Sequence, residues 1–283
     1  MEMKKIGVLG AGMMGAEIAL CFAANGYETI LGDINQELAD RGRDKQAGVL
    51  DRRIAKGKMD SARKGEILAN VTPTGNLADM ADCDLIVEAV LEILDVKTNT
   101  YHQLDMICKP ETIIASNTSS LPITKLAAAV GPGRAFIGTH FNSPASVMKL
   151  VEVIPGLQTR EETVAAVFEV LKAIGKEPVR VKDVTGFALN RMFHAFYLEA
   201  CRLVEEGVCS VEDADKICQY GLGHPMGVFK LIDQTGHDLN MNVDQILFEA
   251  YGERFRPSPL IQRLRDAGRL GKKSGRGFYE YNK

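Results

Sequence analysis

The sequence lacks long apolar runs, clustered cysteines and blocks of charge of one sign. No stretch of eighteen apolar residues occurs among its 283 residues, so it predicts no membrane-spanning helix. Lysine and arginine total 34 and aspartate and glutamate total 37, which gives a net charge of −3. Because five or six like charges never follow one another, neither nucleic acid nor a membrane is expected as a partner.

The six cysteines form no C-x-x-C pair, and they do not cluster with histidines. Zinc sites and redox motifs use such spacing, so the sequence indicates no metal site. We expect six free thiols, mostly buried, in a protein of the reducing cytoplasm. Lys4 and Lys5 precede an apolar stretch as in a signal peptide, but the glycines that follow and Glu17 are not typical of one.

The N-terminal segment has the pattern of a dinucleotide-binding turn. An apolar run at 6–9 is followed by glycines with G-x-G-x-x-G spacing and then by helical periodicity. Such glycines permit the turn, the approach of a pyrophosphate and close helix packing, and the helix N-terminus offers N–H groups to phosphates. The residues expected to bind the dinucleotide are therefore Gly10, Ala11, Gly12, Met13, Met14 and Gly15.

A second strand at 27–32 ends at Asp33, 18 residues after Gly15. A βαβ unit places at this point the carboxylate that binds a ribose diol. The carboxylate would repel a 2′-phosphate, and Ile34 and Asn35 supply no arginine to receive one. The sequence therefore predicts NAD as the cofactor.

Strands and helices alternate up to about residue 184. Strands are expected at 85–90, 112–115, 134–139, 147–154 and 178–182, and helices at 35–58, 95–108 and 161–174. This order predicts a domain at 1–184 with an open, mainly parallel α/β sheet of Rossmann type. The remainder, 185–283, reads as an all-α domain with helices at 187–204, 211–220, 228–234, 237–250 and 259–267, and with a strand pattern only at 277–281.

His140 ends a predicted strand at the edge where such sheets bind ligands. Glu152, twelve residues later, interrupts an apolar strand, and a buried carboxylate needs a partner. If the loop between them reverses the chain, Glu152 faces His140 and orients its ring for acid–base chemistry. The alternative is a surface glutamate and an unconnected core histidine.

Ser119 lies in a polar turn, 116–120, after another predicted strand. Polar turns after strands often only cap the backbone, and Ser116 or Ser120 could take the role of Ser119 equally well. No G-x-S-x-G elbow occurs, which argues against a serine nucleophile and favours a hydroxyl that orients a substrate oxygen. Arg52 and Lys56, four residues apart on a basic helix, form either a solvated face or a contact for a phosphate-bearing substrate.

The other four histidines are expected to have structural roles. His102 is predicted on a helix surface and His194 in a packed or interface position. His224 and His237 lie near a turn and a helix start, and both are expected to cap the backbone there.

Five motifs, in order, resemble the L-3-hydroxyacyl-CoA dehydrogenase family. They are Leu-Gly-Ala-Gly-Met-Met-Gly at 9–15, Ser-Asn-Thr-Ser-Ser-Leu at 116–121, the segment at His140, Val-Met-Lys-Leu-Val-Glu-Val at 147–153, and Gly-Lys-Lys-Ser-Gly-Arg-Gly-Phe-Tyr-Glu-Tyr at 271–281. Within the family the chain is most similar to the short bacterial 3-hydroxybutyryl-CoA dehydrogenases. The similarity runs almost from end to end.

The resemblance implies reversible hydride transfer between NAD(H) and a 3-hydroxyacyl-CoA/3-ketoacyl-CoA pair, with acetoacetyl-CoA as the ketone. It also implies a role in fatty acid and butyrate metabolism. It implies His140 as the catalytic base with Glu152 as its partner, and a homodimer formed through the helical domain. Ser119 and Asn190 would contact the substrate oxygen, and Arg52 and Lys56 would meet coenzyme A. The NAD contacts would come from Asp33, Glu92, Lys97, Asn117, Ser143 and Lys273.

One position departs from the family pattern. The family reads His-Phe-Phe-Asn-Pro, whereas this chain has an asparagine at 142 and a serine at 143. Ser143 therefore takes the asparagine's place and is expected to make a weaker contact. Two other functions stay open: a dehydrogenase for longer or functionalised acyl chains, and a non-catalytic NAD-binding protein, against which the presence of both His140 and Glu152 argues.

Overall fold

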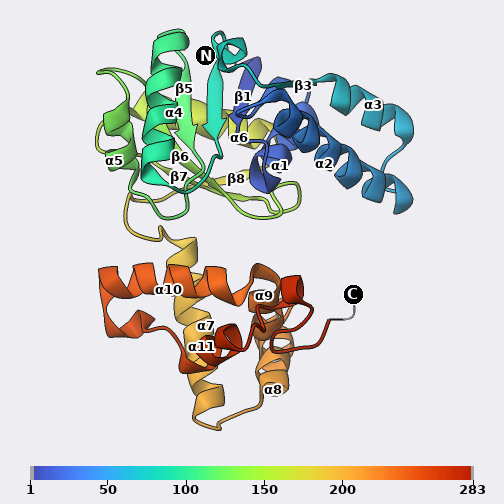
Figure 1. Ribbon diagram of the computed structural model, residues 1–283, viewed down its shortest axis with the longest axis vertical. Coiled ribbons are helices and arrows are strands. Elements are labelled where there is room, and N and C mark those ends of the chain that lie inside the picture. Colours follow the sequence, from blue (N-terminus) through green and yellow to red (C-terminus); the bar gives the residue numbers. More distant parts are fainter. Residues whose placement is uncertain (1–2, 282–283) are drawn as a thin grey trace. The chain divides into compact units, whose positions relative to one another are not determined.

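A computed structural model describes residues 3–281, which form two compact units that divide between Val184 and Thr185 (Figure 1). The first unit contains an eight-stranded sheet in the order β3-β2-β1-β4-β5-β6-β7-β8. Neighbouring strands are parallel except β6 and β7. The predicted Rossmann-type, mainly parallel sheet is therefore confirmed. The strands are β1 (Lys5–Leu9), β2 (Glu28–Gly32), β3 (Val71–Thr74), β4 (Leu85–Glu88), β5 (Ile113–Ser116), β6 (Phe136–Phe141), β7 (Leu150–Ile154) and β8 (Glu177–Arg180).

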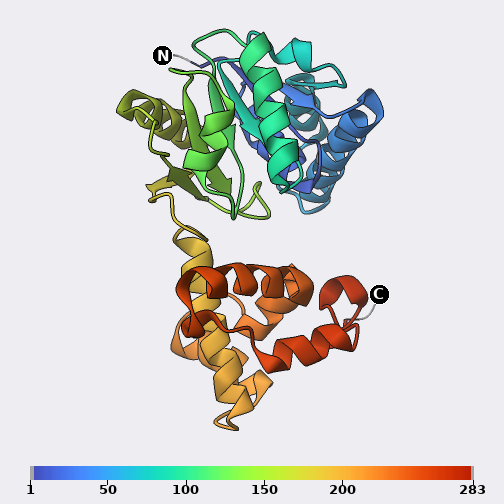
Figure 2. The ribbon, with the colours of Figure 1, turned by 60° about the vertical axis from the view of Figure 1, so that its left-hand side comes forward.

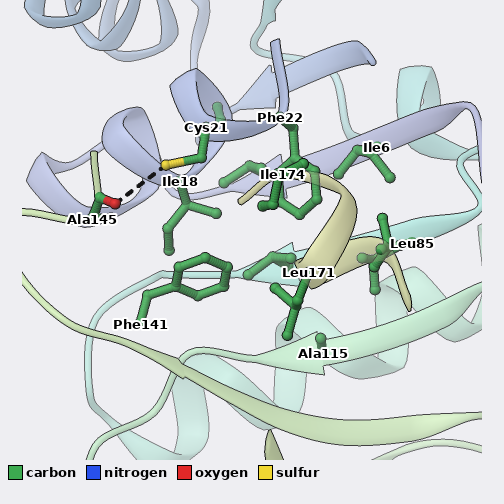
Figure 3. Packing of buried hydrophobic residues seen from close by; sticks show 14 of the residues in the cluster. Ile6, Ile18, Cys21, Phe22, Leu85, Ala115, Phe141, Ala145, Leu171 and Ile174 are labelled. Carbon is green, nitrogen blue, oxygen red and sulfur yellow. Dashed lines mark hydrogen bonds between the residues drawn. The ribbon is translucent and has the colours of Figure 1, made fainter. Parts of the chain in front are cut away.

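Helices lie on both faces of this sheet (Figures 1 and 2). One core cluster joins α1 and α6 to alternate residues of β1, β4, β5, β6 and β7, as Figure 3 shows for Ile18, Leu171 and Phe141. On the other face, Tyr101 of α4 packs edge-on against Phe136 of β6, with ring centroids 4.9 Å apart. The helices of this unit are α1 (Met13–Ala23), α2 (Gln36–Ala55), α3 (Ser61–Ala69), α4 (Leu94–Ile107), α5 (Ile123–Leu126) and α6 (Glu161–Ala173), with 3-10 turns at Leu77–Met80 and Ala127–Ala129.

This topology fixes where ligands bind. Strand β1 pairs with β2 on one side and with β4 on the other, so the strand order reverses there. Open α/β sheets bind ligands beyond the carboxyl ends of the strands at such a switch point. The glycine-rich turn follows β1 at this edge.

The second unit is helical, as predicted. Its core contains Tyr197, Phe229 and Leu247, all fully buried. It comprises α7 (Leu189–Glu205), α8 (Val211–Lys216), a π-helical turn (Ile217–Gly221), α9 (Val228–Thr235), α10 (His237–Tyr251) and α11 (Pro259–Asp266), with 3-10 turns at Glu253–Phe255 and Lys272–Ser274.

The predicted strand at 277–281 is wrong. In the part of the tail that the structure describes, Glu280 forms an isolated bridge with Arg276, which also bridges Gly271, and no strand is present. Its backbone donors bind a side chain instead, because the N–H groups of Phe278 and Tyr279 donate to the Asp233 carboxylate at 3.0 Å each. A carboxylate thus replaces the neighbouring strand.

The structure also bears on the cysteines and on membrane-spanning helices. All six cysteines are free, and five of them are buried, as expected. Among residues 3–281, no helix is long and apolar enough to cross a membrane.

Candidate active site

The three glycines of the turn after β1 have different surroundings. Gly10 has a φ of +102°, and a Cβ there would lie 2.5 Å from the Ala89 carbonyl oxygen. A Cβ on Gly15 would lie 1.7 Å from the Gly10 oxygen, whereas one on Gly12 would meet nothing within 4 Å. The first and third glycines are therefore required by packing, and the second leaves open space beside the backbone.

The open space at Gly12 adjoins the start of a helix. Gly12 is the N-cap of α1, which has no side-chain cap, so the first turn presents backbone N–H groups. Such a helix start attracts phosphate through its N–H groups and its dipole. The turn of residues 10–15 thus fits the pyrophosphate of a dinucleotide.

Asp33 lies directly after β2 and holds the turn in place. Its Oδ2 accepts a hydrogen bond from the Ala11 N–H at 2.7 Å, and its Oδ1 accepts from the Ile34 N–H at 2.7 Å. The Gly10 N–H donates to the Gly32 carbonyl at 2.8 Å. The carboxylate expected to bind a ribose diol therefore lies against the pyrophosphate turn.

Glu92 organises the serine-rich turn at 116–120. Its Oε1 accepts from the Ser119 and Ser120 N–H groups at 3.0 and 3.1 Å and from the Thr118 hydroxyl. Its Oε2 lies 3.2 Å from Lys97 Nζ. Burial raises the pKa of Glu92, but Lys97 and the hydroxyl donors outweigh burial and hold that pKa below its usual value. Glu92 is thus a carboxylate that fixes the backbone at Ser119.

Lys97 is itself buried, at 1 % exposure, and it bridges Glu92 to a deeper carboxylate. Its Nζ lies 2.7 Å from an oxygen of Glu88, which is fully buried at the end of β4. The other Glu88 oxygen accepts from the Tyr101 and Ser116 hydroxyls. The ammonium expected to contact NAD therefore lies between two carboxylates, and in this arrangement it positions Glu92.

Sequence reasoning missed Glu88 and Tyr101. The signal was present, because Glu88 interrupts the apolar run at 85–90 just as Glu152 interrupts its own strand. A charge in a strand buried on both faces requires partners. Those partners lie 9, 13 and 28 residues away along the chain, so no local pattern indicated them.

His140 and Glu152 face each other across the β6–β7 pair. The antiparallel register places them directly opposite, and His140 Nδ1 lies 2.8 Å from Glu152 Oε2. They are 7 % and 1 % exposed. Strand β6 runs two residues beyond its expected end, so His140 lies inside the strand, where the ladder fixes its partner. The chain therefore reverses between the two strands, which is the condition under which the two side chains were expected to face each other.

The pair lies on the same face of the sheet as the Ser119 turn. Side chains alternate along a strand, so His140 shares the face of Phe136, which packs against α4. Glu88 and Ser116 bond to residues of that same helix. Asn117 links the two regions, because its Oδ1 accepts from the Phe141 N–H at 2.9 Å.

The segment after His140 contains the departure from the family pattern. Asn142 donates through Nδ2 to the Leu150 carbonyl at 3.3 Å, which closes the hairpin. Ser143, which takes the place of the family's asparagine, is exposed. The Asn142 side chain thus hydrogen-bonds the backbone of β7, and Ser143 lies at the surface of the loop.

Arg52 and Lys56 are exposed at the carboxyl end of α2. Their neighbour Arg53 donates to the Ser146 carbonyl at 2.9 Å. This bond places the basic end of α2 beside the loop that follows His140.

Two predicted site residues belong to the helical unit. Asn190 is the second residue of α7, and Lys273 lies in the 3-10 turn Lys272–Ser274 with Nζ 2.5 Å from Asp238 Oδ1. Both residues belong to the second unit, which is described by itself.

Three other histidines also have defined surroundings. His102 is exposed and His194 is buried, as predicted, with Nδ1 2.7 Å from Asp244 Oδ1. The capping interpretation of His237 is wrong. Gly236 is the N-cap of α10 with no side-chain cap, and the His237 ring is fully buried with Nε2 2.8 Å from Asp233 Oδ1.

Comparison with known proteins decides the family. A model described as the NAD binding domain of 3-hydroxyacyl-CoA dehydrogenase matches residues 5–184, and the model of the C-terminal domain matches 186–281. The chain belongs to the 3-hydroxyacyl-CoA dehydrogenase family. As a member of that family it is an NAD-dependent dehydrogenase, which agrees with the space at Gly12 and the uncapped start of α1.

Relatives within the family cover the chain almost completely. A probable 3-hydroxybutyryl-CoA dehydrogenase of Deinococcus radiodurans is 43 % identical over 98 % of this chain and 100 % of its own length. The crystal structure of (S)-3-hydroxybutyryl-CoA dehydrogenase from Ralstonia eutropha has a TM-score of 0.93 at 38 % identity and covers both chains fully. A 3-hydroxyadipyl-CoA dehydrogenase of Escherichia coli is 39 % identical over 99 % of this chain and 59 % of its own length.

Proposed function

We propose that the protein is a 3-hydroxybutyryl-CoA dehydrogenase that interconverts 3-hydroxybutyryl-CoA and acetoacetyl-CoA with NAD(H). The observation that carries this proposal is the buried His140–Glu152 pair, 2.8 Å apart on the sheet face that also bears the Ser119 turn. Relatives named for this reaction match the whole chain. Residues 1–184 would bind NAD, and 185–283 would complete the substrate site and form the dimer.

In this reaction His140 moves the proton of the substrate hydroxyl. The N–H at His140 Nδ1 donates a hydrogen bond to the Glu152 carboxylate. This bond selects the tautomer in which Nε2 carries no proton and can accept the proton of the substrate hydroxyl. The ring returns that proton when the ketone is reduced. Positioned proton transfer of this kind supplies about 10²–10⁴-fold in rate.

NAD held by the residues named below would supply the hydride chemistry. Ser119 and Asn190 would hydrogen-bond the substrate oxygen as its charge changes. Arg52 and Lys56 would bind the phosphates of coenzyme A. The residues proposed to hold NAD are Gly10, Ala11, Gly12, Met13, Met14, Gly15, Asp33, Glu92, Lys97, Asn117, Ser143 and Lys273.

The variant His140→Gln tests the assignment. Glutamine keeps a polar side chain at this position but cannot take the proton, so acetoacetyl-CoA reduction should stop. NADH binding, measured by the fluorescence of the bound dinucleotide, should remain. Turnover near the wild-type rate would contradict the role of His140.

A functionalised substrate is the second candidate, because the E. coli relative named for 3-hydroxyadipyl-CoA is 39 % identical. Each methylene of the acyl chain changes discrimination by only about 1–3 kcal/mol. A series of kcat/KM values for straight acyl chains of C4 to C16 and for the adipyl substrate separates the two. A preference for C4 supports the butyryl assignment, and a preference for the acidic or longer substrates replaces it.

We also propose a cytoplasmic homodimer that takes part in fatty acid and butyrate metabolism and associates through the helical unit. Large apolar side chains are exposed there, among them Tyr220 at 85 % and Leu222 at 56 %. Apolar side chains this exposed on one segment fit a surface that a partner subunit covers. Light scattering after size-exclusion chromatography should give twice the mass of 30.9 kDa, and a monomer mass would refute the dimer.

A further inference from the structure

The segment that joins His140 to Glu152 carries little packing of its own. Residues 142–149 connect β6 to β7, and Ala145 is buried at 1 % exposure, whereas Ser143, Pro144 and Val147 are exposed. A turn forms where the Val147 and Met148 N–H groups both donate to the Pro144 carbonyl at 2.9 Å. The conformation of this loop therefore depends on side chains that reach it from elsewhere.

Lys176 reaches the loop at two points. It immediately precedes β8 and is 7 % exposed. Its Nζ donates to the Met148 carbonyl at 2.9 Å and to the Ala145 carbonyl. One ammonium thus binds two carbonyls that are three residues apart, across the body of the loop.

Two helices supply weaker or more exposed contacts to the same segment. Figure 3 shows Cys21 of α1 directed at the Ala145 carbonyl, with Sγ 3.3 Å from the oxygen. A thiol is a weak donor, so this bond adds little. Glu17 of α1 accepts a hydrogen bond from the Ser146 N–H at 3.1 Å, and Arg53 of α2 donates one to the Ser146 carbonyl.

Strand pairing does not need the charge of Lys176. The Glu177 N–H donates to the Lys149 carbonyl at 2.9 Å, so the backbone alone joins β8 to β7. Burying an ammonium costs desolvation, and an apolar side chain of similar volume is often as stable in such a place. What the ammonium adds is a fixed conformation of the loop between Ala145 and Met148.

We infer that Lys176 is a positioning residue that holds segment 142–149, and with it Ser143, in the conformation required for the nicotinamide end of the site. The inference rests on the proposed function, in which Ser143 contacts the cofactor. The loop leaves β6 two residues after His140 and enters β7 two residues before Glu152. A displaced loop therefore displaces Ser143 while the His140–Glu152 pair keeps its strand register.

The test compares Lys176→Met and Lys176→Arg with the control Lys172→Met, which removes an exposed lysine from the last turn of α6. Hydrogen–deuterium exchange of segment 142–149 is measured on the protein without ligands. The Kd for NADH, and kcat and KM for acetoacetyl-CoA, are measured at a temperature where every variant is folded. Arginine retains donors for both carbonyls, and methionine retains only the volume.

We expect Lys176→Met to exchange about tenfold faster in segment 142–149 and to bind NADH several-fold more weakly. Its kcat should fall about 10–100-fold with KM for acetoacetyl-CoA within twofold, because misplaced reactants react slowly. Lys176→Arg should recover most of each loss, and Lys172→Met should match wild type.

Wild-type exchange in the segment, or wild-type NADH affinity and kcat in a folded Lys176→Met protein, would overturn the inference. If methionine prevents folding, Lys176→Gln retains an uncharged amide donor group, and the same measurements decide. Failure of the proposed function shows differently, because the wild-type protein would then not reduce acetoacetyl-CoA, while the exchange experiment uses no substrate.

Discussion

Replacing Glu152 with glutamine should remove most of the catalytic rate while the fold is retained. The cross-strand register holds position 152 opposite His140 whatever its side chain, and glutamine has the size of glutamate. The site is 1 % exposed, so water does not replace the lost carboxylate. The new amide can donate to Nδ1, which favours the tautomer with its proton on Nε2 and prevents that nitrogen from accepting the hydroxyl proton.

The expected loss in kcat is about 10²–10⁴-fold, or about 3–5 kcal/mol in the barrier, which is the full contribution of a positioned base. The assay follows NADH absorbance with acetoacetyl-CoA, and NADH affinity should stay at the wild-type value. Because the two residues act as one unit, the double variant with His140→Gln should lose little more than either single variant. The exposed Glu177→Gln is the matched control.

A kcat within about threefold of wild type in Glu152→Gln would refute this reasoning, because orientation by the carboxylate would then contribute about 0.7 kcal/mol or less. Fully additive losses in the double variant would also contradict it, since they would make His140 and Glu152 independent.

Three further results are expected. Gly12→Ala should fold like wild type, because its Cβ meets nothing within 4 Å, and it should bind NADH more weakly, because that Cβ enters the space proposed for the pyrophosphate. Gly15→Ala should lose thermal stability, because its Cβ would lie 1.7 Å from the Gly10 oxygen. Equal melting temperatures for the two variants would contradict this. The pKa of Asp233 is lowered, since donors from His237, Tyr279 and Phe278 outweigh burial. Its contribution to stability is therefore present above the ordinary pKa of an aspartate, and it is lost as the pH falls through the lower pKa of the folded state. Asp233→Asn should cost about 3 kcal/mol at neutral pH in chemical denaturation, and this cost should shrink below about pH 4; a cost independent of pH would be inconsistent with that account. Asp33 should make kcat/KM with NADH much higher than with NADPH, and a preference for NADPH would overturn the cofactor assignment.

Local patterns allowed much of the fold to be predicted. The strand, turn and helix around Gly10–Gly15 follow from glycine spacing and apolar runs, and the His140–Glu152 pair follows from a charge in an apolar strand. Helix α3 and edge strand β3 were not expected, because β3 contains Pro73 and few apolar residues. Edge strands are only half covered and so lack the strong apolar signal of central strands.

The rest of the site depends on partners far apart in the chain. Lys176 binds carbonyls 28 and 31 residues earlier, and Asp233 binds the tail 45 residues later. Sequence periodicity describes one element at a time and does not indicate which elements meet. For that reason the tail was mistaken for a strand, and the supporting residues Glu88 and Lys176 were found only in the structure.

The most direct test of the account is to add acetoacetyl-CoA to the purified wild-type protein with NADH and to follow absorbance and product. The account predicts consumption of one NADH for each 3-hydroxybutyryl-CoA formed, at a rate abolished by His140→Gln. No NADH consumption by the folded wild-type protein, or equal rates in the two proteins, would contradict the assignment of His140 and Glu152 as the catalytic pair of this dehydrogenase.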